Sequence, residues 1–215
     1  MSPGGPTSDG AFWTGWRSTR AGQAAIRSWD PEFVEVSHGL EASRRRALAA
    51  AADTLRRYGE RLLQTDLGFD YAQGWNREKS LASVLEEGLE RDVQQGVTQH
   101  GPHRADLNIT CDERQARKLV SRGQQKLLAS AMILAATATA QEAVGQPLLL
   151  LLDDPAAELD GQAVSRLLDA VIDLGCQVVA TSLEKEAFRL ADDAVVFHVK
   201  HGVVATAAAA KKASL

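Results

Sequence analysis

Two adjacent carboxylates follow the most apolar run of the chain: Asp153 and Asp154 come directly after Leu148–Leu152. An apolar run without alternation is typical of a strand covered on both faces in a parallel sheet. Its end then lies at the carboxyl edge of the sheet, where open α/β folds bind ligands. Two buried acids at that edge need a cation. We therefore expect Asp153 to hold Mg²⁺, usually through water, and Asp154 to position or deprotonate an attacking water, as in a Walker B site. The alternative is that the pair only caps a strand-to-turn junction.

A second candidate site precedes a long apolar segment, at Ser121-Arg122-Gly123-Gln124. Ser121 and Gln124 have the S-x-x-Q spacing of a capping box, which predicts a well-formed helix start. A serine hydroxyl, a glycine that allows close approach and free amides at a helix N-terminus also make an anion site, suited to a γ-phosphate. The two interpretations use the same atoms, so they do not exclude each other.

A long helix is predicted to begin at Asp30-Pro31, where Asp30 can cap the first amides and Pro31 suits the first turn. Leucines then recur every seven residues, at Leu48, Leu55 and Leu62. This spacing is typical of a coiled-coil arm. An amphipathic helix packed on its own domain fits the pattern equally well.

The rest of the chain predicts a helical region followed by alternating strands and helices. The long helix should end at Gly68 or Gly74, and Leu81–Leu89 should form a second, short helix. We expect strands at Ala105–Asp112, Leu148–Leu152, Gln177–Thr181 and Ala194–Val199, helices at Ser121–Val144, Gln162–Leu174 and Glu184–Leu190, and a final hairpin through Lys200-His201-Gly202. Such alternation is typical of an α/β fold. Residues 1–28 have no clear period, so no element is predicted there.

The composition of the 215 residues is that of a globular protein, with 45% hydrophobic and 24% charged residues and a net charge of −4. The chain is therefore no polycation that coats nucleic acid through bulk charge. Any phosphate contact must come from local basic clusters, and the candidates are Arg44–Arg46, Arg56, Arg57 and Arg61, or Arg114, Arg117 and Lys118. A charge run on a helix is more often a solvated face.

The two cysteines, Cys111 and Cys176, lie far apart and have no spacing typical of a disulfide framework or a zinc site. Their use fits a reducing compartment. The longest apolar stretches fall short of the roughly 20 residues of a membrane-spanning helix, so no span is expected. The N-terminus lacks the basic start and apolar core of a secretory signal. We therefore expect a cytoplasmic protein.

Three motifs, in this order along the chain, resemble the RecF recombination-mediator family. They are Gly-Pro-His-Arg-Ala-Asp-Leu from Gly101, Ser-Arg-Gly-Gln-Gln-Lys from Ser121 and Leu-Leu-Asp-Asp-Pro-Ala-Ala-Glu-Leu-Asp from Leu151. The resemblance extends from about residue 29 to residue 204. It implies the carboxyl-terminal part of an ABC/SMC-type P-loop ATPase head, α/β in class, with a preceding helical arm. The implied organisation is a disordered or divergent leader at 1–28, an arm at 29–95, an ATPase-head lobe at 96–206 and a flexible tail at 207–215.

The resemblance also implies roles for the residues of the two candidate sites. Ser121, Gly123 and Gln124 would belong to the signature loop, which acts in trans on the ATP of a partner. Asp153 would be the Mg²⁺-binding Walker B acid, and Asp154 the catalytic acid beside it.

Other positions match the family outside these two sites. Asp160 would be the D-loop aspartate that crosses to a partner subunit. Thr181 and Ser182 would occupy the nucleotide-facing switch position after the next strand. His103 and Arg104 would lie near the junction between the arm and the ATPase lobe, and the alternative for them is a simple turn with a partly exposed histidine.

By this resemblance the chain is a RecF-like, DNA-binding ATPase component of recombinational repair and replication restart. Such a protein dimerises with ATP on gapped or single-stranded DNA and helps to load the recombinase. The implied cofactors are ATP and Mg²⁺. The implied partners are DNA, a second copy or an intact subunit that carries a P-loop, and recombination mediator proteins.

The P-loop pattern G-x-x-x-x-G-K-[ST] does not occur in the sequence, and none of the seven lysines follows a glycine. In the family this motif belongs to an N-terminal lobe that has no counterpart here, so ATP hydrolysis by this chain alone stays open. One alternative is a catalytically inactive partial lobe that acts as a binding module. A weaker alternative, an ABC transporter ATPase fragment, is disfavoured by the arm helix and by Arg122, where transporters usually have glycine. Strands without their neighbours would also expose an edge, which favours oligomerisation.

Overall fold

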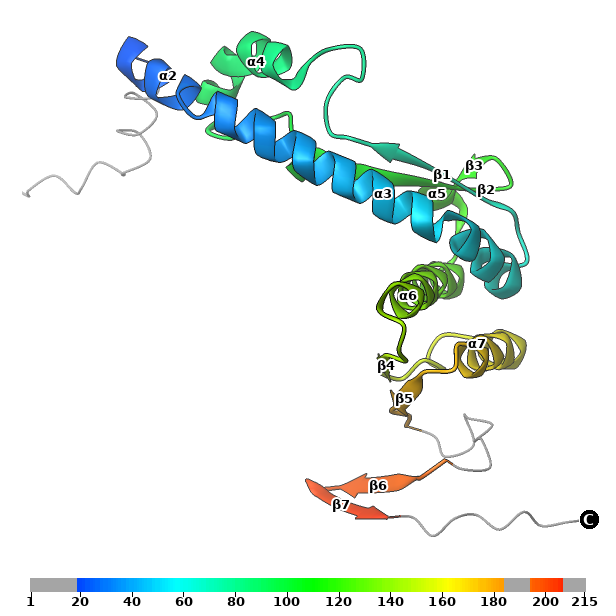
Figure 1. Cartoon of the computed structure of the whole chain (residues 1–215). Coiled ribbons are helices and arrows are strands. Elements are labelled where there is room, and N and C mark those ends of the chain that lie inside the picture. The colour runs from blue at the N-terminus through cyan, green and yellow to red at the C-terminus, as the bar shows by residue number, and fades with distance from the viewer. Residues whose placement is uncertain (1–18, 184–193, 207–215) are drawn as a thin grey trace, which may run out of the picture. The chain divides into compact units, whose positions relative to one another are not determined.

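The structure, a computed structural model, describes residues 19–183 and 194–206 (Figure 1). The chain divides into two compact units, Met1–Gly145 and Gln146–Leu215, each with its own packing. The boundary expected near residue 96 falls inside the first unit, and the division of the chain at that point stays a prediction.

Helix α3, Asp30–Leu63, is the longest element of the first unit (Figure 1). Pro31 lies in its first turn, where the missing amide of proline costs nothing. The residue before the helix is Trp29, whose side chain makes no capping bond, so Asp30 lies within the first turn and is not the cap. The helix ends before either glycine considered in the sequence, because Gln64 takes a left-handed conformation with φ 57°.

One side of α3 packs against other elements of the first unit. Leu55, Tyr58 and Leu62 are buried on it. The elements that contact α3 include α4 (Leu81–Gln95), β1 (Leu67–Ala72), α6 (Arg122–Val144) and the short η1 (Pro102–Arg104). The heptad leucines therefore belong to an amphipathic helix that packs on its own domain, and the coiled-coil alternative is wrong for the described residues.

Two shorter helices lie at the N-terminal end of α3 (Figure 1). Helix α2, Arg20–Arg27, starts after Thr19, whose Oγ1 accepts a hydrogen bond from the amide of Gly22 at 3.1 Å. The sequence predicts no helix there, because the surrounding residues have no clear period. Helix α4 continues to Gln95, beyond the predicted end at Leu89.

A small core joins α4 to α3. Its buried residues are Trp75, Leu81, Val84 and Leu85, with Phe33 and Val34 of α3 packed against them. Ser80 caps α4, since its hydroxyl accepts from the amide of Ser83 at 3.1 Å.

The first unit also holds an antiparallel sheet in the order β1, β2, β3. Strand β2, Asp106–Cys111, confirms the predicted strand, and β3 is the short Arg114–Gln115. Strand β1 is not among the predicted elements, because Gly68 also fits the end of a helix. A Cβ at Gly68 would meet the Thr110 hydroxyl on β2, so a larger residue there would require the Thr110 side chain to rotate away.

Helix α6 follows two short elements, η1 (Pro102–Arg104) and α5 (Ala116–Leu119). It confirms the predicted helix, and in the described part of the chain it is long and apolar enough to cross a membrane by length and composition alone. It packs against α3 and buries four residues: Leu127, Ala131, Leu134 and Ala135. Other apolar residues of α6, Met132, Ile133 and Val144, are exposed.

The second unit contains a βαβ segment and a hairpin. Strand β4 (Leu149–Leu152), helix α7 (Gly161–Asp173) and strand β5 (Gln177–Ala180) follow one another, and the two strands are parallel. Strands β6 (Phe197–Lys200) and β7 (Val203–Thr206) form the predicted antiparallel hairpin. Strand β6 begins three residues after the predicted start at Ala194. The predicted helix Glu184–Leu190 lies outside the described residues.

Strand β4 is covered on one face only. Leu150 is 6% exposed, whereas Leu149 and Leu151 are 56% and 68% exposed. Within the second unit, the expectation that both faces are covered is therefore wrong, and the expectation of strands that have lost their neighbours stays a prediction.

The two cysteines form no disulfide. Cys111 and Cys176 are both free and half-buried, and burial raises the pKa of both thiols above its usual value.

Candidate metal and nucleotide site

The carboxylates predicted to bind metal lie where β4 ends. Because β4 and β5 are parallel and in register from Leu149↔Gln177 to Leu152↔Ala180, the residues that follow both strands meet at one edge of the sheet. The amide of Thr181 extends the ladder by donating to the carbonyl of Leu152 at 2.9 Å. This pairing places Thr181 beside the two acids.

The hydroxyl of Thr181 contacts both acids. It donates a hydrogen bond to Oδ1 of Asp153 at 2.5 Å and accepts one from the backbone amide of Asp154 at 3.0 Å. The first distance is in the range of charge-assisted O–H···O⁻ bonds. Asp154 has φ 41°, so the chain turns sharply away from the strand there. The structure thus brings together three predicted site residues, Asp153, Asp154 and Thr181.

The two acids are less buried than expected. Asp153 is exposed and Asp154 half-buried, so the expectation of two buried acids that need a cation is wrong. The physical reason is the open face of β4, which leaves its end in contact with solvent. Among the described residues, no group of three or more His, Cys, Asp or Glu could hold a metal ion.

Two carboxylates nevertheless suit Mg²⁺ when phosphate supplies the other ligands. Magnesium keeps several waters and usually binds through one or two carboxylates plus phosphate oxygens, and less often in an all-protein cage. Asp153 and Asp154 fit this donor set in number and in chemistry, so they could hold magnesium together with a bound triphosphate.

The predicted signature residues begin α6 in the first unit. The Ser121 hydroxyl accepts from the amide of Gln124 at 3.3 Å, and the Gln124 side chain accepts from the amide of Ser121 at 2.9 Å. This reciprocal pair is the predicted capping box. The cap uses the Ser121 oxygen as an acceptor and leaves its proton for another acceptor. Ser121 and Gln124 are exposed, and Gly123 between them is half-buried.

Asp160 begins α7 as its N-cap. Its Oδ1 accepts from the amide of Ala163 at 2.8 Å. This bond is sufficient to explain an aspartate at this position, because carboxylates are favoured caps. The D-loop role of Asp160 stays a prediction.

The Gly-Pro-His-Arg segment is a fixed turn. Nη1 of Arg44 in α3 donates to the carbonyl of Pro102 at 2.7 Å, and Nε2 of His103 lies 2.8 Å from the carbonyl of Thr98. His103 and Arg104 are both exposed. The alternative of a turn with a partly exposed histidine accounts for these contacts, and the sequence carried no sign that Arg44 holds the turn.

The arginines of α3 make several contacts within the first unit. Arg45 pairs with Glu41 at 2.6 Å and lies over the ring of Tyr71, and Arg56 lies over the ring of Phe69. The guanidinium groups therefore cover the sheet beside them, while about half of each of these two side chains stays exposed.

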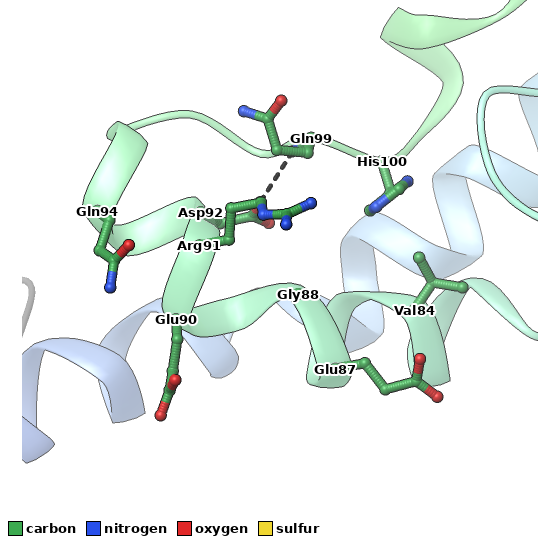
Figure 2. Close-up of a pocket in the computed structure, with 9 residues that line it drawn as sticks. All are labelled: Val84, Glu87, Gly88, Glu90, Arg91, Asp92, Gln94, Gln99 and His100. Carbon is green, nitrogen blue, oxygen red and sulfur yellow. Dashed lines mark hydrogen bonds between the residues drawn. The ribbon is translucent and has the colours of Figure 1, made fainter.

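A polar hollow on α4 is lined by none of the predicted site residues (Figure 2). Arg91 and His100 line it together with the acids Glu87, Glu90 and Asp92. Asp92 accepts a hydrogen bond from the backbone amide of Gln99 at 3.0 Å, which joins α4 to the segment that follows it (Figure 2). Its mixture of opposite charges selects neither an anion nor a cation.

The sequence of the chain is similar to that of proteins of known family. It is 38% identical over 198 residues to the DNA replication and repair protein RecF of Chromohalobacter salexigens, a match that covers 88% of this chain and 54% of that protein. A second match, to the protein of the same name from Cellvibrio japonicus, is 34% identical over 199 residues, 87% of this chain and 53% of that protein.

Over most of its length the chain is similar in sequence to RecF proteins. It spans about half the length of the RecF relatives that it matches. No family model matches the chain.

The fold agrees with this similarity. The chain is similar to a solved structure of the recombination mediator protein RecF-ATP in the RecFOR pathway, with a TM-score of 0.72 and 20% identity over 92% of this chain and 54% of that one. A weaker similarity, with a TM-score of 0.50 and 17% identity, is to an SMC head bound to the C-terminal winged-helix domain of ScpA, over 79% of this chain and 45% of that one. The predicted fold class, a part of an ABC/SMC-like ATPase head, is confirmed.

Proposed function

We propose that this chain forms part of a RecF-like ATPase head that works in recombinational DNA repair and replication restart. It associates with a partner in the presence of ATP, acts on gapped or single-stranded DNA and helps to load the recombinase. The observation that carries the proposal is the 38% identity to a DNA replication and repair protein RecF over 88% of the chain. The fold similarity to RecF-ATP supports it.

In this proposal the second unit supplies the acids of the nucleotide site. Asp153 binds Mg²⁺, and Asp154 orients the attacking water. Magnesium, when bound, neutralises charge on the phosphates. The position of Asp153 and Asp154 at the end of a parallel strand, beside Thr181, supports these roles.

The signature segment acts on the nucleotide of a partner. The hydroxyl proton of Ser121 and the amides of the first turn of α6 face the phosphate, Gly123 allows the close approach, and Gln124 holds the serine in place. The capping box supports this proposal because it leaves the serine proton for a phosphate oxygen. Asp160, at the start of α7, is the residue that crosses to the partner.

The triphosphate that Ser121 faces is held by the P-loop of the partner. The printed sequence contains no G-x-x-x-x-G-K-[ST] pattern, so none of its segments offers the usual cradle of amides and lysine. By analogy with the RecF relatives, we take the partner to be an intact RecF-family subunit, with which other recombination mediator proteins act. DNA is contacted by the exposed arginines of α3, and the proposed location is the cytoplasm.

A second candidate function is that of a binding module without catalysis of its own. The open face of β4, where Leu149 and Leu151 are more than half exposed, favours it. On this account the chain associates with an intact subunit whether or not nucleotide is present. The transporter alternative is not retained, because the relatives described above are RecF proteins.

Sedimentation velocity with full-length RecF of Chromohalobacter salexigens tests the proposal. We expect a complex with the wild-type chain in Mg-ATP and none without nucleotide. Ser121→Arg places bulk and positive charge at the phosphate contact and should abolish the complex. Ser43→Arg, a change of the same kind at an exposed serine of α3, is the control and should leave it intact. Association that is equal with and without nucleotide would favour the binding module. No association under either condition would contradict both candidate functions.

A further inference from the structure

Thr181 is the first residue after β5, and it lies beside Asp153 and Asp154. Three hydrogen bonds join it to the end of β4: its amide donates to the Leu152 carbonyl, its hydroxyl accepts from the Asp154 amide, and the same hydroxyl donates to the Asp153 carboxylate. The last two partners lie 27 and 28 residues away in the sequence. The contact therefore depends on the register of the two strands.

The chemistry of a hydroxyl suits this position. A serine or threonine hydroxyl has one proton to donate and two lone pairs to accept with, so it can take the amide of Asp154 and give its proton to Asp153 at the same time. Valine has the same shape as threonine but can do neither. The branched Cβ of threonine also restricts rotation about χ1, which keeps the hydroxyl aimed at the acids.

The bond leaves Asp153 able to bind a cation. An ionised carboxylate has two oxygens and about four lone-pair sites, and the bond from Thr181 uses one of them on Oδ1. A carboxylate on an exposed turn would otherwise sample several rotamers, and holding one of its oxygens reduces that freedom. Metal ligands are commonly oriented by such outer partners.

We propose that Thr181 is a positioning residue that fixes the carboxylate of Asp153 for metal binding. This inference rests on the proposed function, in which Asp153 holds Mg²⁺. It gives Thr181 a task that differs from the predicted one, since the hydroxyl acts through Asp153 and does not itself contact the nucleotide.

Binding of Mn²⁺, a spectroscopic substitute for Mg²⁺, to the 215-residue chain tests the inference by electron paramagnetic resonance. The variants are Thr181→Val, Thr181→Ser and Asp153→Asn. Thr137→Val is the matched control, because this substitution in α6 removes a comparable hydrogen bond from a threonine hydroxyl to the Ile133 carbonyl. Urea unfolding of each variant reports on folding.

We expect Thr181→Val to weaken Mn²⁺ binding about tenfold, the scale found when outer partners of metal ligands are removed. Thr181→Ser should restore binding to within about twofold of wild type, since it keeps the hydroxyl. Asp153→Asn should abolish saturable binding, and the Thr137→Val control should bind as wild type does.

The outcomes distinguish a failure of the positioning role of Thr181 from a failure of the proposed metal role of Asp153. If Asp153→Asn loses binding while Thr181→Val keeps it, or if Thr181→Ser is as weak as Thr181→Val, the positioning role is overturned and the metal site stands. If Asp153→Asn binds as wild type does, or wild type shows no saturable binding, the metal role of Asp153 is overturned and the inference with it. If Thr181→Val does not fold, Thr181→Ala takes its place in the comparison with Thr181→Ser.

Discussion

The guanidinium of Arg44 donates a hydrogen bond to the main-chain carbonyl of Pro102, 58 residues away, at 2.7 Å. It ties the middle of α3 to the Gly-Pro-His-Arg turn, one of the three motifs by which the chain resembles the RecF family. The motif is thus held by a residue outside it.

Removal of this tie should destabilise the first unit. We expect Arg44→Ala to lower the free energy of unfolding by about 1–2 kcal/mol, because a partly buried carbonyl loses a charged donor. Arg46→Ala is the control: its side chain bonds to the exposed Ser43 on the same helix, so the change should be within about 0.5 kcal/mol. Urea unfolding followed by circular dichroism measures both, and equal effects would contradict a special role for Arg44.

Gly74 faces the same turn and should tolerate no side chain. Its φ is +98°, and a Cβ would collide with the carbonyl oxygen of Gly101. Gly74→Ala should therefore cost about 2 kcal/mol or more. Gly39→Ala provides the comparison, since this glycine lies within α3 and has open space where a Cβ would stand. That change should stabilise the protein by about 0.5–1 kcal/mol, because alanine favours a helix more than glycine does.

Thermal unfolding distinguishes the two glycines directly. The melting temperature should fall for Gly74→Ala and rise for Gly39→Ala. A melting temperature unchanged by Gly74→Ala would mean that the turn at Gly101 moves freely, contrary to its contacts with α3.

The sequence predicts those parts of the fold whose signals are local. Pro31 marks the start of α3, the Ser121 capping box marks the start of α6, and the apolar run before Asp153 is a strand. Strand β1 escapes prediction although Leu67, Phe69 and Tyr71 alternate with less apolar residues, because Gly68 also fits a helix end. The alternation is the signal that could have revealed it.

Two features of the candidate site could not be predicted from the sequence because they depend on tertiary structure. The exposure of Asp153 depends on what covers β4, and no local pattern reports that. The bond between Thr181 and Asp153 depends on how two distant strands pair. The sequence places both residues in one site but cannot assign the contact between them.

The open face of β4 should make the isolated chain self-associate. Leu151 is 68% exposed on a strand that pairs with β5 alone among the described residues, and such edges and apolar faces promote association. Leu151→Lys should shift the chain toward monomer at micromolar concentration without changing its unfolding free energy by more than about 0.5 kcal/mol.

Val36→Lys is the control for this prediction. Val36 is 63% exposed but lies on α3, whose backbone groups are already paired, so the substitution should leave self-association unchanged. Analytical ultracentrifugation over a concentration series compares the two variants. Equal oligomerisation of Leu151→Lys and wild type would show that β4 is not the surface responsible.

Ser121→Asp tests the proposed signature role of Ser121 most directly, because aspartate caps a helix as well as serine does but repels a phosphate. The measurement is the dissociation rate of a fluorescent ATP analogue from full-length RecF of Chromohalobacter salexigens, with Mg²⁺ and an excess of this chain. The account predicts that the wild-type chain slows dissociation at least severalfold and that Ser121→Asp, equally stable in urea, has no effect. Equal slowing by both chains, or none by the wild-type chain, would contradict it.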